Sequence, residues 1–145
     1  SVRAAPWSPA TFDCIALHDS LVRRRLPMAD VVAELEGAHR LLKPGGWLAL
    51  ASPNPPMLRR GFAAGFPRPL LSRLLMKAHF QEIRCLFVDP SADDPCTVVP
   101  DVKAAIRAHE TLAGIRGKAR WKRSAALELG FRYALFPAYL LLARA

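Results

Sequence analysis

The sequence predicts an α/β fold with a mostly parallel sheet, and three observations in the first third of the chain indicate it. An apolar segment at 12–17 is followed by an amphipathic segment at 27–42 and by a second apolar segment at 47–51. Two short buried strands joined by a helix form a βαβ unit, which builds a parallel sheet with a right-handed crossover. Both strands then end at the same edge of the sheet, where open α/β sheets bind their ligands.

The helix of this unit is predicted by one apolar face and by its two ends. Apolar residues recur at the spacing of a single helix face, at Val31, Leu35, Ala38 and Leu42. Pro27 suits the first turn of a helix, and Pro44 is expected to end it. The two glycines at 45–46 then provide a permissive turn before the second strand.

The rest of the chain is predicted to continue the same sheet within a single domain of 145 residues. A Pro- and Gly-rich loop at 52–69 leaves the sheet at the ligand edge, which suits a lid or a substrate loop. A helix opening at Pro69 and a strand at 83–88 follow, and the last strand is expected at 135–144. Residues 91–130 between these two strands are predicted to be a helical insertion, which begins with an irregular connector.

Two segments carry a resemblance to a known family. The strand Phe12-Asp13-Cys14-Ile15, followed about thirty residues later by Leu42-Lys43-Pro44-Gly45-Gly46 and an apolar strand, resembles class I S-adenosylmethionine-dependent methyltransferases. The resemblance covers residues 6–90 well and 131–145 more loosely. It implies a partial Rossmann-like methyltransferase sheet, with helices on both faces and an antiparallel last strand between the two strands before it. It also implies the C-terminal portion of such a domain, because the family's Gly-rich cofactor half lies further upstream.

The function that the resemblance implies is methyl transfer from S-adenosylmethionine to a small-molecule or lipid-like acceptor, incomplete in residues 1–145 alone. It places Leu17 and His18 beside the cofactor and Asp19 near the acceptor, with His18 as a candidate base. Asn54 is a candidate for binding a substrate or cofactor carboxylate. The simpler alternatives are that His18 is a loop residue at a strand end and that Asn54 is a turn residue between prolines.

Charge suggests anionic partners. The chain has 21 basic and 12 acidic residues, for a formal charge of +9. Two basic segments stand out, 23–25 and 116–123, and a solvated face is the simplest interpretation of each. The second contains Trp121, which suits peripheral contact with an anionic membrane, whereas one aromatic is too few for nucleic acid. A non-catalytic basic α/β module that binds nucleic acid or anionic membrane is therefore the alternative function, followed by another Rossmann-like nucleotide-cofactor enzyme.

The cysteines and histidines predict neither a disulfide framework nor a metal site. The chain has three cysteines, an odd number, and they lie far apart: Cys14, Cys85 and Cys96. This pattern indicates reduced thiols in a cytoplasmic protein. Cys14 and Cys85 are expected to be buried within strands. His39 and His109 fall on apolar helix stripes without a second ligand at metal-binding spacing. The longest apolar run, at 134–143, is shorter than the roughly twenty residues that a membrane span needs.

Overall fold

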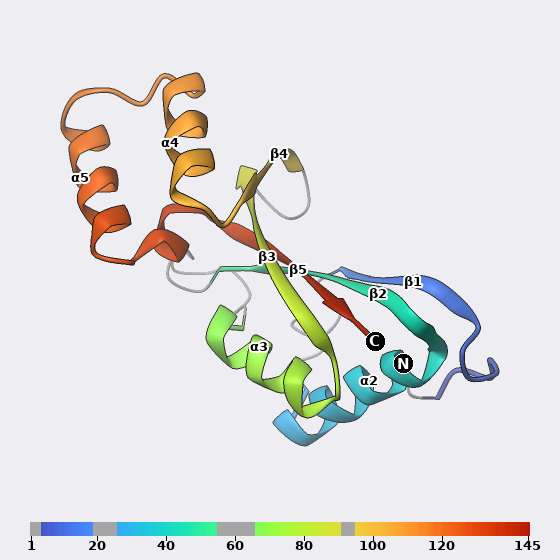
Figure 1. Cartoon of the computed structure of the whole chain (residues 1–145). Coiled ribbons are helices and arrows are strands. Elements are labelled where there is room, and N and C mark those ends of the chain that lie inside the picture. Colours follow the sequence, from blue (N-terminus) through green and yellow to red (C-terminus); the bar gives the residue numbers. More distant parts are fainter. Residues whose placement is uncertain (1–3, 19–25, 55–65, 91–94) are drawn as a thin grey trace.

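A computed structural model of the chain describes residues 4–18, 26–54, 66–90 and 95–145. It contains one mixed sheet of five strands in the order β1-β2-β5-β3-β4 (Figure 1). The predicted basic segment 23–25 and most of the predicted lid lie outside the described residues.

The sheet has the predicted reversed strand between two parallel ones. β1 (Phe12–His18) pairs in parallel with β2 (Leu42–Pro53). β5 (Ala138–Arg144) is antiparallel to β2 on one side and to β3 (Gln81–Pro90) on the other. Since β1, β2 and β3 therefore run in one direction, their carboxyl ends share one edge, as the sequence predicted.

The segment predicted to be a turn at the start of β2 belongs to the strand, and there it forms a bulge in which Gly45 has the permissive geometry that was expected. Helix α2 (Met28–Leu41) begins directly after Pro27, as expected, and ends three residues before Pro44. Phe12 lies opposite Leu42, and Cys14 lies opposite Trp47, so the intervening residues of β2 form a bulge. Gly45 adopts a φ of +77° within that bulge, and its N–H donates to the carbonyl of Ala145. Backbone pairing with the end of β5 holds this segment extended.

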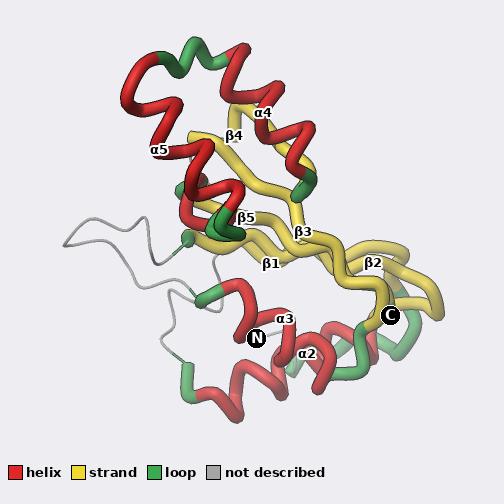
Figure 2. Tube along the Cα trace, turned by 60° about the vertical axis from the view of Figure 1, so that its left-hand side comes forward, coloured by secondary structure: helices red, strands yellow, loops and turns green. Residues whose placement is uncertain are grey.

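Helices α2 and α3 (Arg68–Lys77) cover one face of the sheet (Figure 2). Both present the apolar stripe that the sequence predicted, and these residues are fully buried in the core: Val31, Leu35, Ala38, Leu71 and Leu75. His79, between α3 and β3, has a φ of +69°, in the left-handed region that usually favours glycine at the end of a helix. The burial of these stripes accounts for the close packing of both helices on β2 and β3.

The connection from β3 to β5 contains a strand where a connector was expected. β4 (Pro95–Pro100) pairs antiparallel with β3, since Val99 packs into the core opposite Phe87. Helices α4 (Lys103–Leu112) and α5 (Gly117–Glu128) follow, and α4 packs beside β4 while α5 packs beside η2, near the carboxyl ends of the parallel strands (Figure 1). The other face of the sheet is open in the described residues, since Cys14, Ala16 and Val98 are exposed on it, so the helices on both faces that the resemblance implied are not seen here.

β5 begins later than predicted. The short 3-10 helix η2 (Arg132–Leu135) occupies the residues before it, and Pro137 lacks the N–H that a strand pairing would use. The pairing with β2 therefore starts at Ala138, which lies opposite Pro53. In the described ranges, no helix is both long and apolar enough to cross a membrane.

Candidate functional site at the carboxyl edge of the sheet

The strand ends that the sequence assigned to a cofactor lie side by side. Leu17 pairs with Leu50 and His18 with Ala51, where β1 and β2 finish. The Leu17 side chain is 8% exposed and belongs to the hydrophobic core, so its main chain is the part that faces this edge. The side chain of His18 and the whole of Asp19 lie outside what the structure describes.

Asn54 links the end of β2 to the segment just before β5 through two hydrogen bonds. Its side chain is 2% exposed, and its Nδ2 donates a hydrogen bond of 3.0 Å to the carbonyl of Phe136. Its main-chain N–H donates to the carbonyl of Pro137 at 2.8 Å. Buried amide groups are costly unless they are hydrogen-bonded, so these contacts stabilise the edge. The residue therefore has a structural task that a simple turn between prolines would not require.

Tyr139 is a second buried polar residue at this edge. It pairs with Ser52 across the β2–β5 ladder, and its hydroxyl donates to the carbonyl of Phe66, just before α3. Burial raises the pKa of Tyr139, and a hydrogen bond with Ser52 offsets part of that effect. The phenol thus stays protonated near neutral pH and acts as a donor. This residue was not singled out from the sequence, because it lies in an apolar run.

A buried carboxylate joins three segments on the α3 side of β3. Asp101, which is 10% exposed, lies 2.9 Å from Nη2 of Arg68 and 2.7 Å from Nε of Arg132. The contact with Arg132 is an ion pair without hydrogen-bond geometry at Oδ1 of Asp101. Nearby, burial raises the pKa of the Cys85 thiol to about 11, so Cys85 is protonated and unreactive near neutral pH. Cys14, in contrast, is exposed, because β1 is the last strand of the described sheet.

Phe136 is the centre of an aromatic and charged cluster between the sheet and the α4–α5 pair. Its ring stacks on Phe87, with centroids 4.7 Å apart, and the guanidinium of Arg123 lies 5.6 Å from its centroid. Arg123 also pairs at 2.8 Å with Glu110, which is 3% exposed. His109 packs against Phe136, and its Nε2 lies 3.4 Å from Asp89. This packing agrees with the place of His109 on an apolar stripe of its helix.

A cavity of about 510 Å³ opens at the opposite edge of the sheet, where β2 and β3 begin. It is lined by His39 and His79, whose ring centroids lie 6.2 Å apart, together with Arg40 and Lys43. Burial and the neighbouring His79 lower the pKa of His39. The residues predicted to contact cofactor and acceptor do not line this cavity. The carboxyl edge is therefore the better candidate for chemistry, because that is where open α/β sheets assemble their sites.

Solved structures match this fold over nearly the whole chain. A methyltransferase from Thermotoga maritima, described as S-adenosylmethionine-dependent and as a possible histamine N-methyltransferase, matches with a TM-score of 0.62 and 15% identity. The match covers 99% of this chain and 60% of that one. Phosphoethanolamine N-methyltransferase 2 from Haemonchus contortus, solved with phosphomonomethylethanolamine and S-adenosylhomocysteine, matches with a TM-score of 0.55 and 13% identity, covering 99% and 36%.

Another structure with this fold is described as a cyclase, SpnF, and matches with a TM-score of 0.52 and 20% identity, covering 99% of this chain and 53% of that one. No protein-family model matches the sequence, and neither does any curated protein. The chain therefore has the fold of class I S-adenosylmethionine-dependent methyltransferases. It spans only 60% of the Thermotoga structure and less of the other two.

Several contacts at this edge carried no signal in the sequence. The partners Asn54 and Phe136 are 82 positions apart, and Tyr139 and Phe66 are 73 positions apart. Short-range periodicity cannot report contacts at such separations. A polar residue inside an apolar strand, such as Tyr139, is the one clue that was present.

Proposed function

We propose that this chain contributes the carboxyl-side part of a domain that transfers a methyl group from S-adenosylmethionine to a small-molecule acceptor. The observation that supports it is the strand order β1-β2-β5-β3 with β5 reversed, in a fold that matches the Thermotoga methyltransferase over 99% of this chain. The cyclase match illustrates that one fold can host different reactions, so the assignment depends on the residues at the edge.

The described residues fit one wall of a cofactor site. S-adenosylmethionine supplies an electrophilic methyl group on sulfur, and an in-line displacement depends mainly on the positioning of the two reactants. We propose that Leu17 and His18 contact the cofactor where β1 ends beside β2. Leu17 would do so through its main chain, because its side chain packs in the core.

The acceptor is proposed to lie next to the cofactor, near Asp19 and Asn54. Asn54 would act as a positioning residue, since its amide holds the start of β5 against the end of β2. The Haemonchus structure contains a small phosphorylated amine, which supports a small polar acceptor for this fold. We include a lipid-like molecule among the acceptors that this proposal covers.

Calorimetry with S-adenosylmethionine tests the proposal directly, on the product of the complete reading frame and on residues 1–145 in parallel. We expect stoichiometric binding by the first, and binding at least about a hundredfold weaker by the second, because one wall buries little of the ligand. Absence of binding by the product of the complete reading frame would contradict the proposal. Transfer of a labelled methyl group to small amines would then identify the acceptor class.

Substitution of His18 tests the assignment within the site. In the product of the complete reading frame, we expect His18→Ala to weaken cofactor binding about tenfold, the loss of one good contact. The matched control is His39→Ala, which removes a histidine at the opposite edge and should leave binding unchanged. Equal losses in the two variants would show that His18 has no specific part in the site.

A further inference from the structure

Helix α5 has an outer face that the rest of the described chain does not cover. At 100° per residue, Lys118, Lys122, Ala125 and Leu129 fall on one side, with Trp121 beside them. The opposite side is buried through Leu127, which is fully enclosed. We call these five residues, from Lys118 to Leu129, the outer face of α5.

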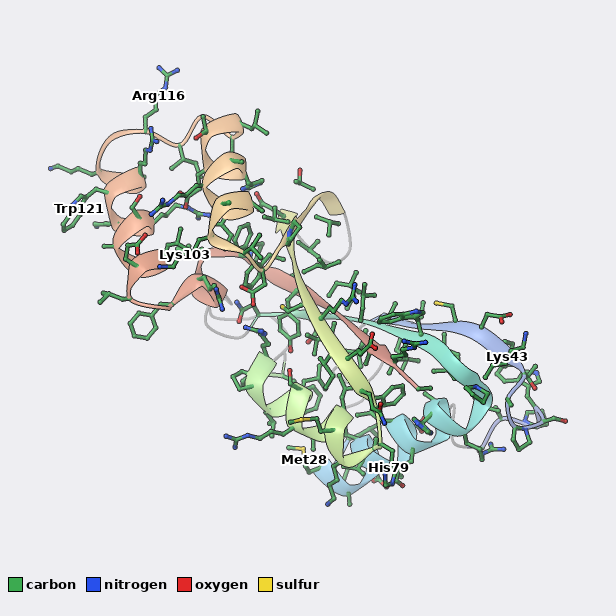
Figure 3. The ribbon with its side chains drawn as sticks, in the orientation of Figure 1. Met28, Lys43, His79, Lys103, Arg116 and Trp121 are labelled. Atoms are coloured by element: carbon green, nitrogen blue, oxygen red, sulfur yellow. The ribbon has the colours of Figure 1, made fainter. Side chains whose placement is uncertain are left out.

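Two large apolar side chains of this face are exposed. Trp121 and Leu129 are each 72% exposed. Trp121 points away from the rest of the molecule, as does Arg116 at the tip between the two helices (Figure 3). Exposed apolar groups that gather at one place on a surface mark an interaction site more often than single ones do.

The charge around these apolar groups is of one sign. Arg116, Lys118, Arg120 and Lys122 are exposed, and within the described ranges none of them forms an ion pair with a carboxylate. The one acidic residue of α5, Glu128, is held at 2.8 Å by Lys103 from α4, and hydrogen bonding by Lys103 lowers its pKa. No carboxylate of α5 therefore offsets the cations of the outer face.

We infer that the outer face of α5 docks on the surface of an anionic phospholipid membrane. Lysines extend their charged ends to lipid phosphates while their stems lie along apolar groups, and tryptophan favours the membrane–water interface. Nucleic acid fits less well, since binding to single strands uses several stacked aromatics and this surface offers one. The exposed leucine also has no counterpart on a sugar–phosphate backbone, whereas the acyl boundary of a membrane accommodates it. The inference is independent of the methyl-transfer proposal.

Flotation with vesicles tests the docking on the 145-residue chain itself. We expect the chain to float with equimolar phosphatidylglycerol and phosphatidylcholine, and to remain unbound with phosphatidylcholine alone. In a Trp7→Phe, Trp47→Phe background, the emission of Trp121 should shift to the blue when anionic vesicles are added, because its ring leaves water. Failure to float with the anionic vesicles, or binding that leaves Trp121 emission unchanged, would overturn the inference.

Paired variants separate this surface from the overall charge. Lys118→Gln with Lys122→Gln should weaken binding about thirtyfold, which corresponds to about 1 kcal/mol for each cation near the surface. The matched control is Arg73→Gln with Lys77→Gln, two exposed cations with the same spacing on α3. Equal losses in the two pairs would overturn the assignment to α5.

A further pair of variants tests the apolar side chains of the outer face, and a competition experiment tests nucleic acid as the alternative ligand. Leu129→Ser should weaken vesicle binding several-fold, whereas Met76→Ser, at a side chain 58% exposed on α3, should not. Single-stranded oligonucleotide is added as a competitor. Tighter, Trp121-dependent binding to the oligonucleotide than to vesicles would overturn the membrane inference in favour of nucleic acid.

Discussion

Asp101 contacts three separate segments of the chain. Its carboxylate lies between guanidiniums from the first residue of α3 and from η2, and its main-chain N–H donates to Cys85 in β3. This carboxylate is 10% exposed, and the two cations replace the water that burial removes from it. The same arrangement leaves Arg68 and Arg132 without a counter-charge if Asp101 is neutralised.

Replacement of Asp101 by Asn should therefore destabilise the chain strongly. We expect the free energy of unfolding to fall by about 3 kcal/mol, the usual cost of removing one partner from a buried ion pair. The control is Asp13→Asn, whose partner Lys43 is 2.9 Å away at an exposed site, and which should change stability by less than about 1 kcal/mol. Urea unfolding measures both. Similar losses for the two variants would show that burial does not strengthen the Asp101 contacts.

At the scale of elements, the junction of α2 with the start of β3 contains two neighbouring histidines. His39 on α2 lies edge-to-face against Phe80, with ring centroids 5.1 Å apart, and close to His79. Burial first, and the charge of His79 second, lower the pKa of His39 below its ordinary value of 6.5. The unfolded chain consequently binds a proton at His39 more readily than the folded chain does.

This difference makes the packing of α2 sensitive to acid. The contribution of His39 to stability is complete above its unfolded pKa of 6.5 and is lost as the pH falls from there through the folded pKa. We expect His39→Gln to reduce the fall in the free energy of unfolding between pH of about 7.5 and about 5. Urea titrations at the two pH values measure this. An unchanged pH dependence would contradict it.

His79→Asn separates the two causes of the lowered pKa. Asparagine tolerates the left-handed φ of +69° at this position, so the substitution removes the charge with little strain. The pKa of His39, measured by NMR, should rise but stay below 6.5, since burial is the larger cause. A complete return to 6.5 would show that the charge of His79 dominates.

For the whole molecule, the open side of β1 is the most informative feature. β1 ends the described sheet, and Asp13, Cys14 and Ala16 are exposed on it. A sheet edge leaves backbone N–H and C=O groups free to pair with a further strand. The chain spans 60% of the Thermotoga structure, and we expect a further strand to pair at this edge in a longer domain.

Hydrogen exchange measures how far this edge is exposed in the 145-residue chain. We expect the amides of β1 to exchange faster than those of β2 and β5, which are paired on both sides. In the product of the complete reading frame, β1 should become protected to the level of β2. Equal protection of β1 and β5 in the 145-residue chain would show that another segment already covers the edge.

Much of the fold could be predicted because local patterns encode it. The apolar stripe of α2, the stripe of α3 and the short apolar strands repeat at the spacings of helix and strand, and the structure confirms each of them. Proline and glycine marked boundaries less reliably. The segment after α2 is extended strand, since pairing with β1 and β5 outweighs the turn preference of Pro44 and Gly45.

By itself, the sequence determined the α/β class, the βαβ unit and the direction of the last strand, because periodicity and the family pattern act over short distances or in fixed order. Only the tertiary structure decided that 95–100 is a strand, that Asn54 donates a hydrogen bond to Phe136, and that Asp101 forms ion pairs with two arginines. These features join residues that are distant in the chain and compatible with several local structures. Burial and backbone pairing select among those structures, and both exist only once the chain has folded.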